Sequence, residues 1–213
     1  NSNVSFVEDL MAMKASILVA QSKHEKAIEA FKALEDKASN SDNRLIARLG
    51  VMRSAVKIDN YAVMEAYADK LLNGSGLSAA EEKEAAFCRA YARYQQGNSE
   101  VASKEFAELA KNGNSIYGAQ ASFYLAELQF GENRLNEAEN TLNTFIDSGT
   151  EHNYWLARAF ILLADIYHKQ GKTFEAREYL ESLKGSYPGE ADGIMEMIDS
   201  RLKKWSSTKT KKK

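Results

Sequence analysis

The chain has 213 residues, 44% of them hydrophobic, with one proline and one cysteine. This composition supports a folded core, excludes an intramolecular disulfide or a cysteine-based metal cluster, and favours long helices over β-sandwiches and barrels. No apolar run approaches the ~20 residues of a membrane-spanning helix, and outside the lysine-rich residues 206–213 the chain holds 24 basic and 30 acidic residues, which argues against a nucleic-acid partner.

Apolar residues recur at helical spacing along the chain, and polar breaks predict where the helices end. We expect antiparallel helix pairs at residues 5–21 and 23–38, 42–58 and 60–72, 79–96 and 98–111, 116–131 and 134–147, and 152–170 and 172–184. Ser22 with Glu25 and Ser78 with Glu81 match the capping-box pattern and predict two helix starts. A last helix at 190–205 has one apolar stripe, which predicts a cap over the final pair, and an outer charged face that includes Arg201.

The breaks inside the pairs repeat at a nearly constant interval. They lie at Ser22, Asp59, Gly97, Asn133 and Gly171, with spacings of 37, 38, 36 and 38 residues. Five residues after each break stand Ala27, Met64, Ala102, Ala138 and Ala176, and seven before each stand Ala15, Met52, Ala90, Ala126 and Ala164. Small residues allow two antiparallel helices to approach closely, and larger residues one turn later fill the gap to the next pair. In the second pair the large and small positions are exchanged: Met52 and Met64 stand where the other units have alanine, and Ala68 stands where they have a larger residue.

This pattern resembles the tetratricopeptide repeat (TPR) family over about residues 8–188. The fifth unit carries the clearest match, with Leu163-Ala164, Tyr167, Gly171, Ala176, Leu180 and Pro188 at the signature offsets. The chain departs from the family in its period, since the family repeat has about 34 residues, and four units lack the closing proline. The resemblance implies an all-α, right-handed α-α superhelix, a single solenoid over 1–205. The implied repeats are 5–40, 41–77, 78–114, 115–150 and 151–188, followed by a capping helix at 190–205 and a disordered basic tail at 206–213.

Candidate catalytic and metal-binding residues are sparse. The three histidines, His24, His152 and His168, show no spacing typical of a metal site. Cys88 stands among alanines and a phenylalanine, where a thiol is expected to be buried and inert. We therefore predict no metal, no cofactor and no enzymatic activity.

In the TPR family the first helix of each pair lines an inner groove, and the resemblance implies which residues would face a partner. They are Arg53, Lys57, Phe87, Tyr91, Tyr94, Phe123, Glu127, Phe130, Arg158, Ile161, Asp165 and His168. Aromatic rings flanked by charge are typical of a peptide-binding surface; the alternative is that several of these rings belong to the core. Phe87 and Phe123 stand where relatives that bind C-terminal carboxylates carry lysine, which disfavours that ligand class.

We therefore expect a non-catalytic module that binds another protein or a peptide in this groove. The alternative is a structural or assembly segment of a longer repeat protein of the bacterial cell envelope, because the first unit fits the repeat less well and residue 1 is asparagine. The sequence leaves the oligomeric state open, as well as the choice between cytoplasm and periplasm.

Overall fold

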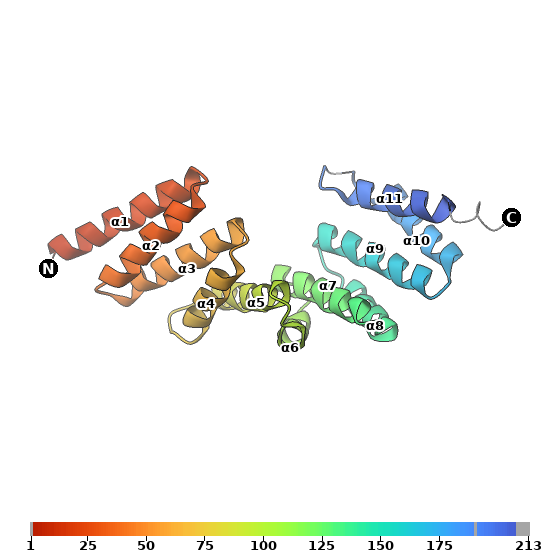
Figure 1. The fold of residues 1–213 in the computed structure, drawn as a ribbon, viewed down its shortest axis with the longest axis horizontal. Coiled ribbons are helices and arrows are strands. Elements are labelled where there is room, and N and C mark those ends of the chain that lie inside the picture. Colours follow the sequence, from red (N-terminus) through yellow and green to blue (C-terminus); the bar gives the residue numbers. More distant parts are fainter. Residues whose placement is uncertain (1, 190, 208–213) are drawn as a thin grey trace. The chain divides into compact units, whose positions relative to one another are not determined.

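The computed structural model describes residues 2–189 and 191–207, and every regular element in this part of the chain is an α-helix (Figure 1). The helices are α1 (Ser2–Ala20), α2 (His24–Lys37), α3 (Ser41–Lys57), α4 (Tyr61–Leu72), α5 (Ala79–Gln95), α6 (Ser99–Ala110), α7 (Ile116–Gly131), α8 (Leu135–Asp147), α9 (Asn153–Lys169), α10 (Thr173–Ser186) and α11 (Ile194–Ser207). The all-α prediction is therefore confirmed. The chain divides between Glu105 and Phe106, inside α6, into two compact units.

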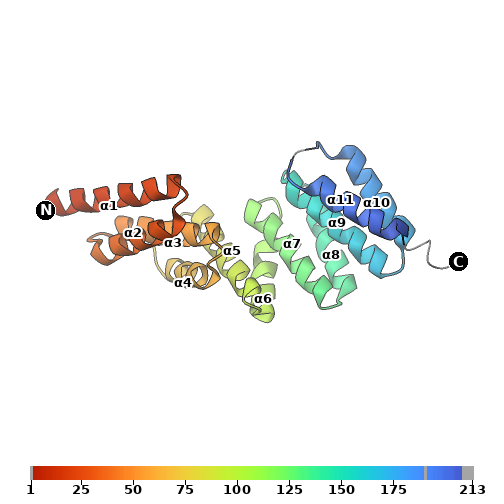
Figure 2. The ribbon, with the colours of Figure 1, turned by 45° about the horizontal axis from the view of Figure 1, so that its top comes forward.

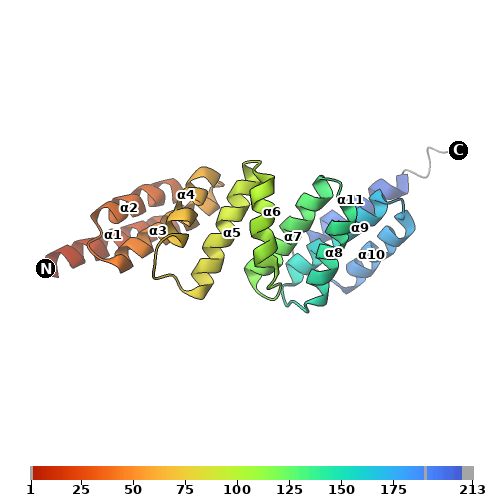
Figure 3. The ribbon, with the colours of Figure 1, turned by 90° about the horizontal axis from the view of Figure 1, so that it is seen from below.

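Within each unit the helices follow the same translational pattern. In the first unit, α1 pairs with α2 and α3 pairs with α4, while α1 also contacts α3 and α3 contacts α5 (Figure 3). In the second unit, α7 pairs with α8 and α9 with α10, and α9 contacts both α7 and α11. The first helices of successive pairs thus lie next to one another, as a solenoid requires.

All five predicted breaks adopt the left-handed backbone conformation that ends a helix. Their φ angles are positive, at 56° for Ser22, 52° for Asp59, 83° for Gly97, 62° for Asn133 and 84° for Gly171. At Gly171 the amide donates to the His168 carbonyl at 3.0 Å, and the amide of Lys172 donates to the Tyr167 carbonyl at 2.9 Å. This is the Schellman pattern, which reverses the chain within a few residues. The regular recurrence of turn residues in the sequence therefore reflects a specific backbone geometry.

One of the two predicted capping boxes is confirmed and the other is wrong. The Ser78 hydroxyl accepts from the Glu81 amide, and the Glu81 carboxylate accepts from the Ser78 amide at 2.9 Å. Ser22, by contrast, ends α1 in the left-handed conformation, so it cannot adopt the extended backbone of an N-cap. The N-cap of α2 is Lys23, which makes no side-chain capping bond.

The predicted small and large positions form the core of each hairpin. All ten residues at the two small positions are almost completely buried, including the exchanged Met52 and Met64. The large Phe31 from α2 reaches the next pair, where its ring lies against Gly50 of α3: a Cβ atom at Gly50 would stand only 2.5 Å from the ring. A glycine therefore provides the space into which the preceding pair packs.

The last helix covers the end of the second unit, as predicted. Helix α11 lies beside α9 and α10 (Figure 2). Its residues Ile194, Ile198, Leu202 and Trp205 are buried in the core that they share with those helices. Of the tail predicted at 206–213, Ser206 and Ser207 belong to α11, and residues 208–213 lie outside the described residues. None of the described helices is both long and apolar enough to cross a membrane.

Candidate functional site

In the first unit, the predicted partner-binding residues lie on α3 and α5. Arg53 of α3 forms a two-pronged ion pair with Glu84 of α5, with Nε–Oε1 and Nη2–Oε2 distances of 2.8 and 2.6 Å. Half of the Arg53 side chain is exposed, and Lys57 is exposed at the end of α3. The fork holds the two neighbouring first helices in register and leaves cationic groups at the surface.

The aromatic residues of α5 form a cluster of rings three, seven and ten residues after Glu84. The Phe87 ring is buried and lies parallel to Tyr91, with ring centroids 5.9 Å apart. Tyr91 also meets the edge of Tyr61 at 6.1 Å and the ring of Tyr94 at 6.4 Å. Tyr91 and Tyr94 remain partly exposed. Phe87 therefore supports the cluster from below, and the two tyrosines form its solvent-accessible part.

In the second unit, Arg158 of α9 organises the corresponding residues of α7. Its guanidinium lies 4.0 Å from the centroid of the buried Phe123 ring and 3.9 Å from the Glu127 carboxylate. The ammonium of Lys169, at the end of α9, lies 4.7 Å from the ring of Phe130, which stands farther along α7. Cations over aromatic faces are attracted by the ring quadrupole, so these contacts order the side chains of both helices.

The remaining predicted residues, on α9, lie under the capping helix. Ile161 is buried, and Asp165 forms an ion pair with Arg201 of α11, at 2.8 Å from Nε and 2.7 Å from Nη2. The His168 ring stacks on Trp205 with centroids 4.5 Å apart. The prediction that Arg201 belongs to the outer face of the last helix is therefore wrong, because Asp165 draws it inward. Sequence reasoning treated Asp165 as a partner contact and missed this pairing.

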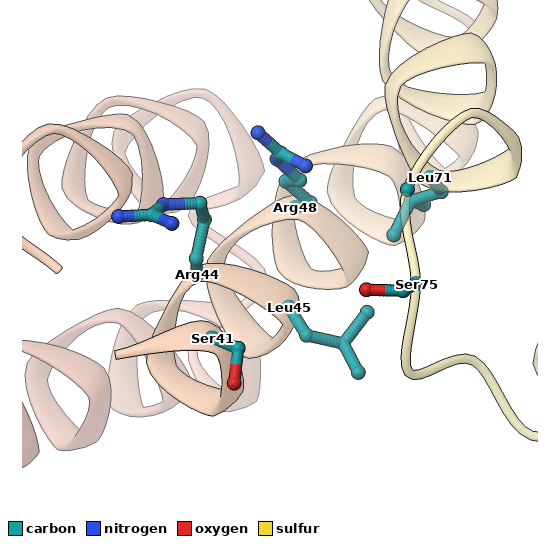
Figure 4. A pocket seen from close by; sticks show the side chains of 7 residues that line it. Ser41, Arg44, Leu45, Arg48, Leu71 and Ser75 are labelled. Carbon is teal, nitrogen blue, oxygen red and sulfur yellow. The ribbon is translucent and has the colours of Figure 1, made fainter. Parts of the chain in front are cut away.

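A separate open hollow of about 170 Å³ lies in the first unit, beside the start of α3 (Figure 4). Its polar lining includes Arg44 and Arg48, and both guanidinium groups have partners in the protein: Arg44 donates to the Ala38 carbonyl at 2.9 Å and Arg48 to the Glu35 carboxylate at 2.7 Å. These bonds connect α2 to α3. The hollow is therefore better explained by packing between helix pairs than by ligand binding.

Glu35 is the centre of a polar cluster between α2, α3 and α4. Burial raises the pKa of its carboxyl, but hydrogen bonds from Arg48, Tyr67 and Lys70 outweigh burial and leave the pKa below its ordinary value. Burial and the bond to Glu35 together raise the pKa of the Tyr67 hydroxyl. The carboxylate therefore acts as a structural acceptor.

The single thiol, at Cys88, is buried in the structure. Burial, with a smaller contribution from Glu84, raises the pKa of the Cys88 thiol to about 12. A thiol with that pKa is a poor nucleophile at neutral pH. Among the described residues, no three metal-binding side chains come together.

Comparisons with known proteins agree on the fold. The family profile of the tetratricopeptide repeat-like domain matches residues 61–194. The chain is similar to YrrB, described as a TPR protein with an unusual peptide-binding site, at 16% identity and a TM-score of 0.63, over 91% of this chain and 90% of that one. It is also similar to MamA (from residue 41) of Desulfovibrio magneticus RS-1, at 13% identity and a TM-score of 0.65, over 91% and 96%. A TPR protein of Parabacteroides merdae ATCC 43184 gives 17% and 0.64, over 96% and 80%. At these identities the likeness shows the fold alone, and no curated protein sequence matches significantly.

Proposed function

This chain belongs to the tetratricopeptide repeat-like family, and we propose that it binds a segment of a partner protein along the first helices of its repeats. Domains of this family are typically non-enzymatic interaction modules. The observation that carries the proposal is the surface of α3 and α5, where the Arg53–Glu84 fork joins the two helices and Tyr91 and Tyr94, farther along α5, lie partly exposed. We call this surface, with Lys57, the tyrosine face.

The tyrosine face has the physical properties of a recognition surface. Tyr91 is held from two sides by Phe87 and Tyr61, so ordering its ring on binding costs little conformational entropy. Tyrosine combines a large apolar area with a hydroxyl that fixes the position of a ligand. Such rigid aromatic anchors carry much of the binding energy in many interfaces.

The charges around the tyrosine face favour a particular partner chemistry. Glu84 is already bound to Arg53, whereas Lys57 is exposed. We therefore propose a segment with apolar side chains for the tyrosines and an acidic side chain for Lys57. The residues on α7 and α9 of the second unit, Arg158 and Glu127 among them, form a separate candidate surface within that unit.

A random-peptide phage library provides a direct test. Peptides selected on the wild-type protein should contain apolar residues next to an acid. Tyr94→Ala should weaken their binding roughly tenfold, the effect of losing about 1.4 kcal/mol at an aromatic anchor. Lys57→Glu, as a separate variant, should also weaken their binding, and more strongly at low salt than at high salt. Lys104→Glu, at an exposed position of α6, is the matched control and should bind like the wild type. If the selected peptides bind equally well to the wild type and to all these variants, the tyrosine face is not the binding site.

The second proposal is a structural or assembly role, as in a longer repeat protein of the bacterial cell envelope. One observation favours it: several large apolar side chains of α1 are exposed, Phe6 and Met13 the most. An assembly role predicts that this face is covered by protein, whereas peptide binding at the tyrosine face does not require it.

A further inference from the structure

One face of α1 has a continuous apolar stripe in contact with solvent. Phe6, Leu10, Met13 and Ile17 are 63%, 47%, 60% and 50% exposed. The opposite face of the helix, with Glu8 and Ala15, is buried against α2 and α3. Figures 1 and 2 show α1 at the edge of its unit, with α2 and α3 beside it. We call these four side chains the α1 stripe.

The spacing of the α1 stripe is that of a coiled-coil seam. Successive members are four, three and four residues apart, so Leu10 and Ile17 occupy a positions of a heptad repeat, and Phe6 and Met13 occupy d positions. A seam of this kind packs best against a helix with the same spacing, because each side chain fits between residues of the facing helix. A second copy of α1 meets this requirement.

The charges beside the α1 stripe specify how two copies would be oriented. Asp9 and Lys14, both exposed, are five residues apart on opposite edges of the stripe, at the g and e positions of the heptad. In a parallel pair, g of one helix faces the e position five residues later on the other, so each Asp9 meets Lys14 of the second copy. In an antiparallel pair, g positions face g and e positions face e, so like charges would share each edge.

We propose that two copies of this chain associate through the α1 stripe as a parallel helix pair, with Asp9 and Lys14 forming two symmetric ion pairs across it. The contact is isologous, because the same patch serves on both copies and the assembly closes as a dimer. Since the stripe points away from α2 and α3, the rest of each first unit lies on the outside of the pair. The dimer uses neither Tyr91 nor Tyr94, so its failure and that of peptide binding are separable.

Sedimentation equilibrium of the 213-residue chain over a micromolar dilution series tests the dimer. The wild type should dissociate from dimer to monomer on dilution, and Leu10→Glu with Met13→Glu should be monomeric throughout. Phe174→Glu replaces a large apolar residue that is 73% exposed on α10, and as the matched control it should still dimerise. Circular dichroism verifies that all variants keep their helices.

Charge exchange tests the pairing itself. Asp9→Lys and Lys14→Asp should each raise the dimer dissociation constant roughly tenfold, because two attractive pairs become repulsive. The double variant restores both pairs and should return to within about threefold of the wild type. Met13→Cys tests the orientation, because a parallel pair places the two Met13 positions face to face, so an oxidised disulfide dimer should form.

Three results would overturn the proposal. The first is a wild-type chain that stays monomeric at every concentration, which would assign the α1 stripe to a different protein or to a neighbouring repeat. The second is a dimer that the Leu10 and Met13 substitutions leave unchanged. The third is a charge-exchanged double variant that stays as weak as the single ones.

Discussion

Gly50→Ala tests whether Phe31 fixes the distance between the first two helix pairs. A Cβ atom at residue 50 would lie 2.5–2.6 Å from three carbons of the Phe31 ring, about 1 Å closer than carbon atoms in ordinary contact. The ring is 5% exposed and belongs to the core of the first unit. It therefore has little room to move without shifting α2 away from α3.

Two opposing effects set the magnitude. Overpacking a core by one methyl group costs typically 1–3 kcal/mol, whereas alanine in place of glycine inside a helix gains about 1 kcal/mol. We therefore expect the free energy of unfolding to fall by about 1 kcal/mol. Gly185→Ala in α10 has the same propensity gain, and nothing lies within 4 Å of its added carbon, so this control should be more stable than the wild type by up to about 1 kcal/mol.

Urea unfolding followed by circular dichroism measures both changes. Adding Phe31→Leu to Gly50→Ala removes two of the three clashing ring carbons, Cε2 and Cζ. The double variant should therefore be up to about 2 kcal/mol more stable than the sum of the two single losses predicts, because most of the overpacking cost disappears. If Gly50→Ala proves as stable as Gly185→Ala, or if the two substitutions are simply additive, the ring does not set the spacing between the pairs.

Three further predictions concern the turns, the acid side of the stability profile and the thiol. Ser22→Gly should raise the free energy of unfolding by roughly 0.5–1 kcal/mol, and Gly171→Ala should lower it by about 1 kcal/mol, because both residues have positive φ; denaturant titration measures both. A hydrogen bond from Arg93 lowers the pKa of Glu65 below its ordinary value of 4.5. The ionised Glu65 carboxylate should therefore stabilise the fold fully above pH 4.5, and this stabilisation should disappear as the pH falls through the lowered pKa. In Glu65→Gln this part of the pH dependence of the free energy of unfolding should be missing. The Cys88 thiol, whose pKa burial raises to about 12, should react with a thiol-specific disulfide reagent at pH 8 only after denaturant is added.

The sequence predicts the backbone of this fold well because the turns and the close helix crossings depend on local residue size. A left-handed turn requires glycine, asparagine or a similar residue, so Gly97, Asn133 and the other breaks identify it directly. Ser22 shows the limit of that reasoning. Serine is a preferred N-cap residue at a helix start, so the sequence alone could not decide whether Ser22 begins α2 or forms the left-handed turn after α1.

The polar contacts between helices were much harder to predict. Asp165 and Arg201 are 36 residues apart, and their pairing depends on how α11 is rotated against α9. A heptad or TPR pattern specifies which face of a helix is apolar, but it does not specify which neighbour a long charged side chain reaches. For the same reason the sequence could place Phe87 and Phe123 on the first helices of their pairs but could not predict that both rings are buried.

The two proposals together predict avidity. A dimer formed by α1 carries two tyrosine faces, and linked binding sites gain 10²–10⁴ in apparent affinity only where both can engage at once. On a sensor surface densely coated with a selected peptide, the wild-type chain should therefore dissociate much more slowly than the Leu10→Glu, Met13→Glu variant. On a sparse surface the two should dissociate at the same rate, because each dimer then binds through one face. Equal rates on both surfaces would mean that self-association and partner binding are physically independent, even if each occurs.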